Sequence, residues 1–175
     1  LTPSVDCSIR YNLKYIILIA FFYFGINNLK AQATLPVYNS DPTIAQTGWS
    51  YVGADNVTGN YDCAGNGTNV LRFNAVNETA VVNYGTAATT VSFYIQKNNN
   101  NAKTLLIEES VNGTTYTTVA TITQAALAAN NTTYQLSYTL SAASRYVRFN
   151  MTVNSGGAFF LDGIAVYNTT APLCA

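Results

Sequence analysis

Five side chains on two segments of the chain have the chemistry that holds a sugar: Tyr94, Gln96, Tyr146, Arg148 and Asn150. An aromatic ring packs against the apolar face of a sugar ring, and amide and guanidinium groups hydrogen-bond to its hydroxyls. The five side chains share one outer face of a β-sheet if their two strands are neighbours, and we then expect a glycan-binding surface. The alternative is an exposed β surface on which cross-strand pairs add stability and bind nothing.

A second stretch of the chain is rich in oxygen ligands. Asp55, Asn56, Asn60 and Asp62 crowd one predicted loop and could surround a cation. Their spacing is not that of an EF-hand, and Asp and Asn are ordinary turn residues. Turn formation is therefore the preferred interpretation, with a metal site as the alternative.

No pattern of residues points to catalysis. The chain contains no histidine, which excludes a Ser-His-Asp or Cys-His arrangement and any histidine metal ligand. Glu108 and Glu109 are adjacent, so in a strand they point to opposite faces and cannot flank one glycosidic bond. Cys63 has no evident activating base. The single tryptophan, Trp49, is expected in the core rather than in a binding site.

The N-terminal residues have the organisation of a secretory signal peptide. Arg10 and Lys14 precede an apolar run from Tyr15 to Ile26, and Ala31-Gln32-Ala33 is a small-residue cleavage site. The run is shorter than the roughly 20 residues of a membrane-spanning helix, so a permanent anchor is the weaker interpretation. We therefore expect residues 1–33 to form a signal-peptide helix outside the domain. The remainder is expected to be secreted or exposed at the cell surface, with no stable membrane span.

Removal of the signal peptide takes Cys7 with it and leaves Cys63 and Cys174. These two could form a disulfide in an oxidising compartment. Equally, Cys174 could pair with a cysteine beyond the given sequence, or both could be free thiols. The chain begins with Leu rather than Met and ends in a linker-like segment, 169–175, so we expect it to be part of a larger multidomain protein.

The exported part carries five basic residues against seven acidic ones and has no basic run. Nucleic-acid binding needs a basic footprint, which this composition does not provide. We therefore exclude nucleic acid as a partner.

From Trp49 onward, apolar and polar residues alternate with a period of two, with turn residues about every eight to twelve positions. This pattern predicts an all-β fold in residues 34–168, a two-sheet antiparallel β-sandwich of the jelly-roll type. Asn112-Gly113 suits a type I′ hairpin turn. The clearest predicted strands are 70–75, 80–84, 90–96, 103–109, 115–122, 133–140, 145–153 and 159–167.

Alternation also predicts the core. Alternate residues of segments 90–96 and 145–153 should point inward, joined by those of the strand between them. The predicted core residues are Val91, Phe93, Ile95, Tyr134, Leu136, Tyr138, Leu140, Val147, Phe149, Met151 and Val153.

The order of several short motifs resembles a known family. They include Thr47-Gly48-Trp49, Leu71-Arg72-Phe73, Ser144-Arg145-Tyr146-Val147-Arg148-Phe149 and Phe160-Leu161-Asp162-Gly163-Ile164. Over about residues 34–168 the chain is similar to the secreted jelly-roll modules of Bacteroidetes, related to cleaved-adhesin and carbohydrate-binding-module-like domains. The resemblance implies a non-catalytic accessory module whose partner is a polysaccharide or a cell-surface glycan.

Many members of that family hold a structural calcium ion through an acidic pair near the last strand and an acidic residue near the first. Asp162 matches the former position, but Gly163 replaces the second acidic residue, and Asp41 is the only acidic residue near the start. Calcium takes six to eight oxygen ligands, so this set is depleted. We expect either no cofactor or a structural calcium ion held by Asp162 and Asp41.

The leading hypothesis is a secreted binding module that holds a glycan for a larger extracellular protein. The alternative is a structural or adhesive spacer domain of a surface protein, without a small ligand. An enzyme is the least favoured of the three.

Overall fold

Eleven β-strands and one short 3₁₀ helix make up the described part of the chain, residues 32–33, 35, 37–39, 46–58 and 69–168 of a computed structural model. All of these residues belong to one unit, Ala31–Ala175. The elements are β1 (Val37–Asn39), β2 (Trp49–Val52), β3 (Asp55–Thr58), β4 (Asn69–Phe73), β5 (Thr79–Asn83), β6 (Thr90–Lys97), β7 (Lys103–Ser110), β8 (Thr117–Thr123), η1 (Gln124–Ala126), β9 (Tyr134–Thr139), β10 (Tyr146–Asn154) and β11 (Phe159–Tyr167).

All eight predicted strands are present, and each end lies within two residues of its predicted position. The structure adds β1, β2 and β3. The prediction of a loop at Asp55 and Asn56 is wrong, because both residues belong to β3, which pairs with β4 from Asp55↔Arg72 to Thr58↔Asn69. Strand pairing here overrides the turn preference of Asp and Asn.

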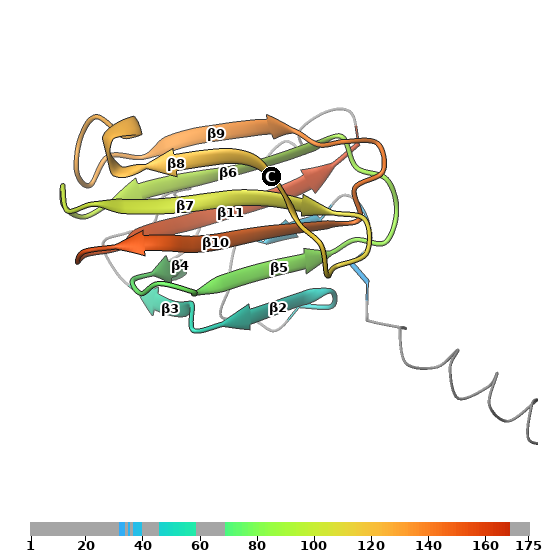
Figure 1. Cartoon of the computed structure of the whole chain (residues 1–175), viewed down its shortest axis with the longest axis horizontal. Helices are drawn as coiled ribbons and strands as arrows, with labels where there is room; N and C mark the ends of the chain where they lie inside the picture. The colour runs from blue at the N-terminus through green and yellow to red at the C-terminus, as the bar shows by residue number, and fades with distance from the viewer. Residues whose placement is uncertain (1–31, 34, 36, 40–45, 59–68, 169–175) are drawn as a thin grey trace, which may run out of the picture. The chain divides into compact units, whose positions relative to one another are not determined.

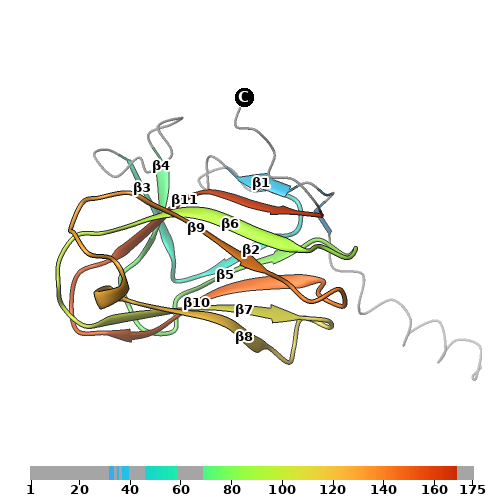
Figure 2. The same cartoon turned by 90° about the horizontal axis from the view of Figure 1, so that it is seen from above.

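The strands form two antiparallel sheets, which confirms the predicted β-sandwich (Figures 1 and 2). One sheet has the order β3-β4-β11-β6-β9, with β1 also paired to β11. The other has the order β2-β5-β10-β7-β8, which runs from bottom to top in Figure 1. From β4 to β7 the chain changes sheet at every connection, so strands that are adjacent in sequence face each other across the core.

The core lies between the two sheets and is built from the inward residues of each. Phe93 on β6 meets Phe149 on β10 across the interior, with ring centroids 5.2 Å apart and planes at 88°. This edge-to-face contact is the preferred geometry of two aromatic rings. Both side chains are at most 1% exposed, so the contact is sealed from water. Of the predicted core residues, those in β6 and the first part of β10 are confirmed.

Two details of the predicted core need correction. Val153 is 44% exposed, because β10 shifts register against β7 between Met151 and Val153 and the alternation is interrupted there. In addition, β9 does not lie between β6 and β10: it is the edge strand beside β6, and β10 belongs to the other sheet. Its tyrosines and leucine are consequently only half-buried, although they pack against the core.

The outer faces of the two sheets differ in burial. On the six-stranded sheet the outward residues Ser92, Gln96 and Phe160 are buried. On the five-stranded sheet, Arg148 and Asn150 of the central strand β10 are only half-buried. The middle of the five-stranded sheet is therefore more open on its outer side than the middle of the six-stranded sheet, whose edge strand β9 is exposed at Gln135, Ser137 and Thr139.

One end of the sandwich is held by a buried lysine. The Lys103 ammonium donates to the carbonyl oxygens of Asn99 and Asn101 at 3.1 Å and of Gly156 at 3.4 Å. Burial, and then the charge of Lys97, lower the pKa of Lys103. The ammonium thereby joins the β6–β7 loop to the β10–β11 loop.

A buried tyrosine joins the end of β5 to the connection between β9 and β10. The Tyr84 side chain is 1% exposed and hydrogen-bonds through its hydroxyl to Ser144, which precedes β10. Burial raises the pKa of Tyr84 from 10.0 to about 12, and the hydrogen bond to Ser144 only partly opposes this. The neutral phenol is thus favoured by the folded state.

Phe149→Ala should lower the free energy of unfolding by about 3–5 kcal/mol, because it removes the ring that crosses from one sheet to the other. Phe149→Leu, which keeps most of the apolar volume, should cost less. Urea unfolding followed by circular dichroism measures both values. A loss below about 1 kcal/mol for the alanine variant would contradict the assigned core.

Tyr84→Phe should change the dependence of stability on alkaline pH. The folded pKa is above the unfolded one, so the contribution of the neutral phenol is fully present below pH 10 and is lost as the pH rises from 10 to about 12. The phenylalanine variant cannot ionise here and should lose less stability over this interval. At neutral pH it should be weaker by about 0.5–1.5 kcal/mol, because the hydrogen bond to Ser144 is gone. Equal alkaline slopes in urea unfolding would show that the assignment is incorrect.

Candidate functional site

The five predicted ligand-binding residues divide between the two sheets. Tyr94 and Gln96 lie on β6 in the six-stranded sheet, whereas β10 with its three residues belongs to the five-stranded sheet. The expectation of one shared outer face is therefore wrong. Alternation along a strand tells which residues share a side of that strand, but it does not tell which strands are neighbours.

The two residues on β6 are held within the protein. Gln96 is 5% exposed and donates from Nε2 to Thr133 Oγ1 at 2.8 Å. Tyr94 is half-buried and packs against a small apolar cluster that includes Val70 and Phe160. Both side chains thus contribute to the packing of the six-stranded sheet.

Two of the three residues on β10, Arg148 and Asn150, bind a carboxylate of the neighbouring strand β7. Arg148 Nε donates to Glu108 Oε2 at 2.7 Å, and Asn150 Nδ2 donates to the same oxygen at 3.2 Å. Glu108 is opposite Arg148 in the register of the two strands. The pair fixes the direction of the guanidinium on the outer face.

An aromatic ring holds the guanidinium from one side. The Arg148 Cζ atom lies 3.8 Å from the centroid of the Tyr116 ring, which precedes β8. Such a stack over a tyrosine is favourable electrostatically. Burial raises the pKa of Tyr116, which the nearby Arg148 charge partly opposes. Within the described residues, Nη1 and Nη2 of Arg148 make no hydrogen bond, and 27% of the side chain is exposed.

The tip of the β7–β8 hairpin also touches the ring of Tyr146. Gly113 has a φ of +71°, and a Cβ at this position would lie 2.8 Å from Tyr146 Cε1. The predicted type I′ turn at Asn112-Gly113 is wrong, because that turn needs a positive φ at both residues and Asn112 is not among the described residues with positive φ. Only glycine allows the turn to approach the ring so closely. The hairpin therefore forms one border of the candidate site, and Tyr146, Arg148 and Asn150 form its floor.

Glu108 and Tyr116 were not among the predicted binding residues. Glu108 was considered only as a catalytic carboxylate and rejected, and the pairing of β7 with β10, which gives it a partner, is not visible in local sequence. Arg148 and Glu108 are the only charged outward residues of these five strands, so the candidate site carries no net charge.

Trp49 is not part of the candidate site. It packs against the core from β2, as predicted, and its ring stacks on that of Tyr51 with centroids 6.0 Å apart and planes at 14°. The structure thus places the single tryptophan in a structural position.

The alternative interpretation, a cation site at Asp55, does not fit the structure. Asp55 Oδ1 accepts a hydrogen bond from Arg72 Nε at 2.8 Å, and its second oxygen pairs with Arg72 Nη2. Both carboxylate oxygens are thus engaged by one guanidinium. Asn60 and Asp62 lie outside the described residues.

Only one of the two predicted calcium ligands, Asp162, lies within the described residues. Asp162 is 2% exposed, and its Oδ1 accepts the backbone N–H of Gly163 at 2.6 Å. No group of three or more His, Cys, Asp or Glu residues occurs in the part of the chain that the structure describes. One carboxylate falls short of the six to eight ligands that calcium takes. Asp41 lies outside the described residues, so calcium binding stays a prediction.

The remaining sequence predictions also fall outside the described residues. They concern the signal peptide up to residue 31, the pairing of Cys63 with Cys174 and the segment 169–175. Among the residues that are described, no helix has the length and hydropathy to cross a membrane.

Solved structures with the same fold are known, although the sequence itself finds no relative. No family model matches the chain, and a search of curated protein sequences gives no significant match. The K3 cleaved adhesin domain of Lys-gingipain from Porphyromonas gingivalis W83 is 14% identical, with a TM-score of 0.60; the match covers 78% of this chain and 100% of that one.

Two carbohydrate-binding modules are also similar. The xylan-binding domain of family 22 is 13% identical over 78% of this chain and 96% of its own, with a TM-score of 0.54. A family 11 module from Clostridium thermocellum, in complex with a β-1,3-1,4-mixed-linked tetrasaccharide, is 15% identical over 81% of this chain and 100% of its own, with a TM-score of 0.50. The chain therefore has the β-sandwich fold of adhesin domains and carbohydrate-binding modules, as its sequence motifs implied.

Arg148→Ala should destabilise the protein by about 1–3 kcal/mol, because it leaves the buried Glu108 carboxylate without its guanidinium. Adding Glu108→Gln should recover part of this loss, with a coupling energy of about 0.5–3 kcal/mol between the two positions. A double-mutant cycle by urea unfolding measures the coupling. Strictly additive losses would show that the two side chains do not interact.

Proposed function

We propose that the protein is a non-catalytic glycan-binding module that uses the outer face of its five-stranded sheet. The observation that carries the proposal is the fixed group Arg148, Asn150 and Tyr146 on the sheet whose middle is the more open of the two on its outer side. The guanidinium is oriented by Glu108 and stacked on Tyr116 before any ligand arrives. A preorganised site loses little conformational entropy on binding.

The charge of this face favours a neutral polysaccharide. Glu108 compensates Arg148, so an acidic sugar gains little net attraction, whereas neutral hydroxyls can accept hydrogen bonds from Arg148 Nη1 and Nη2 and from Asn150. The ring of Tyr146 offers an apolar surface to a sugar ring. The two carbohydrate-binding modules of the same fold support this choice, since one is described as xylan-binding and the other holds a mixed-linked β-glucan fragment.

The cellular setting belongs to the same proposal. Residues 1–33 act as the signal peptide, 34–168 form the module, and 169–175 lead towards a further part of a larger extracellular protein. The protein thus works in secreted form or at the cell surface. The likeness to an adhesin domain supports this location.

A structural or adhesive spacer domain is the second candidate. It is favoured by one observation, the TM-score of 0.60 with a cleaved adhesin domain, which is higher than that with either carbohydrate-binding module. In that case the outer face contacts another protein domain or nothing at all.

The proposal predicts retention of the protein on a neutral polysaccharide from a panel that includes xylan and mixed-linkage β-glucan, with uronate polymers for comparison. Arg148→Ala should lower the affinity about tenfold or more, because it removes the hydrogen bonds that the charged guanidinium donates to the sugar hydroxyls. Arg72→Ala is the matched control: Arg72 also pairs with a carboxylate, but on the six-stranded sheet, and its loss should leave affinity unchanged. Circular dichroism verifies that both variants are folded.

Affinity electrophoresis and calorimetry measure the binding. No retention of the wild-type protein on any polysaccharide would overturn the proposal in favour of the spacer. An equal loss in the Arg72 and Arg148 variants would show that the binding face is assigned incorrectly.

A further inference from the structure

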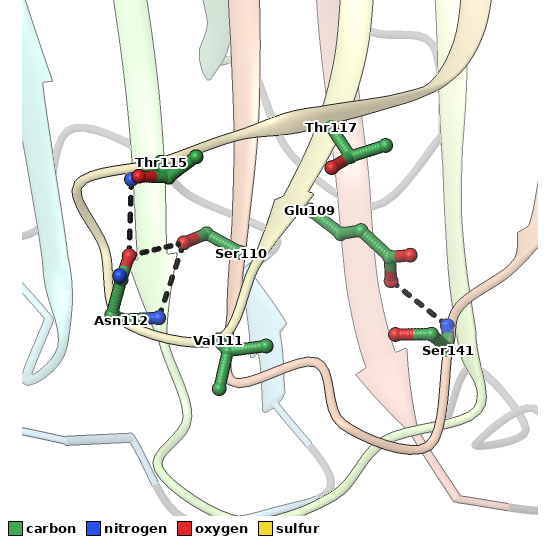
Figure 3. Close-up of a pocket in the computed structure, with 7 residues that line it drawn as sticks. All are labelled: Glu109, Ser110, Val111, Asn112, Thr115, Thr117 and Ser141. Atoms are coloured by element: carbon green, nitrogen blue, oxygen red, sulfur yellow. Dashed lines mark hydrogen bonds between the residues drawn. The ribbon is translucent and has the colours of Figure 1, made fainter.

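A pocket of about 230 Å³ opens at the end of the sandwich where the β7–β8 hairpin meets the connection between β9 and β10 (Figure 3). It is separate from the outer-face site. Glu108 and Glu109 are adjacent in β7 and point in opposite directions: Glu108 is opposite the outward Arg148, whereas Glu109 is opposite Val147, which is fully buried in the core. Glu109 therefore faces the space between the two sheets at its open end.

The Glu109 carboxylate is partly used and partly available. Its Oε2 accepts the backbone N–H of Ser141 at 2.8 Å, which joins the hairpin to the β9–β10 connection. Its second oxygen, Oε1, has no hydrogen bond within the described residues. Figure 3 shows Thr117 beside the Glu109 carboxylate, with Ser141 and Val111 on the other side.

Hydrogen bonds within the hairpin tip make the wall of the pocket rigid. Asn112 Oδ1 accepts the backbone N–H groups of Thr114 and Thr115, each at 3.0 Å. Ser110 Oγ accepts the N–H of Gly113 at 2.9 Å and donates to Asn112 Oδ1 at 3.1 Å. The pocket is consequently formed before a ligand enters, which lowers the cost of binding.

The lining distinguishes between classes of ligand. The Glu109 charge disfavours an anion. An ammonium group has donors only and could not use the hydroxyl hydrogens of Thr117 and Ser141, whereas sugar hydroxyls both donate and accept. Val111 is 61% exposed, and its methyl groups can contact the C–H face of a sugar ring. The volume lies below the roughly 300 Å³ at which pockets for larger ligands begin, so it has room for one ring.

We infer that this pocket is a second sugar site, which takes the terminal residue of a glycan chain. Adjacent hydroxyls of that residue donate to Glu109 Oε1, with Thr117 and Ser141 as further partners. Hydrogen bonds to a carboxylate are among the strongest that a sugar can make. The inference rests on the proposed function in taking a glycan as the ligand, but it uses a different surface and different residues.

The test is an NMR titration of the ¹⁵N-labelled protein with neutral methyl glycosides, single sugar rings that cannot extend along the sheet. The backbone amide peaks of Val111, Thr117 and Ser141 should shift as the glycoside is added and reach a plateau when the site is saturated. Glu109→Gln should weaken the binding about tenfold or more, while the amide oxygen can still accept from Ser141. Val111→Ser, at an exposed position of the β7–β8 hairpin, should weaken it as well. Arg72→Ala, on the six-stranded sheet and outside both sites, is the control and should leave it unchanged.

Three outcomes would overturn the inference. They are no shift of these peaks with any methyl glycoside tested, the same affinity in Glu109→Gln as in the wild type, and tighter binding of methylammonium than of the glycosides. The two proposals fail separately. Polysaccharide binding that depends on Arg148 without glycoside shifts at the pocket leaves the outer-face proposal standing and removes this one. Glycoside binding that depends on Glu109, without polysaccharide binding that depends on Arg148, leaves the pocket inference standing and removes the outer-face proposal.

Discussion

The packing of two sheets against each other determines everything else in this structure. Side chains alternate along each strand, so one half of them must be buried between the sheets if the apolar surface is to leave water. The contact of Phe93 with Phe149 is the central example, because each ring comes from a different sheet. Once the inward positions are committed to this core, only the outward residues and the ends of the sandwich remain for a ligand.

These remaining surfaces are unequal. The middle of the six-stranded sheet is buried on its outer side as well, whereas the five-stranded sheet presents Arg148 with its two fixed neighbours, Glu108 and Tyr116. The β7–β8 hairpin takes part in both candidate sites. Its tip borders the outer face through Gly113 and Tyr146, and its inner side forms the pocket around Glu109. The two sites that we propose for sugars therefore share one hairpin.

The sequence predicted what depends on local order and failed where spatial neighbourhood decides. The period-two pattern found eight strands and the inward residues of β6 and of the first part of β10, because burial on one face is recorded in alternation itself. It could not place β6 and β10 in different sheets, since sheet order depends on pairings between distant segments. Tyr94 was therefore grouped with Arg148 although they lie on opposite sides of the molecule. For the same reason Glu108 was missed, as its role comes from the pairing of β7 with β10.

The most direct test of the account is a crystal structure of the protein with an oligosaccharide fragment of the polysaccharide that it binds. We expect the sugar to lie on the five-stranded sheet, with hydroxyls within hydrogen-bond distance of Arg148 Nη1 or Nη2 and of Asn150, and a ring against Tyr146. A sugar bound on the six-stranded sheet, next to Tyr94 and Gln96, would contradict the central claim.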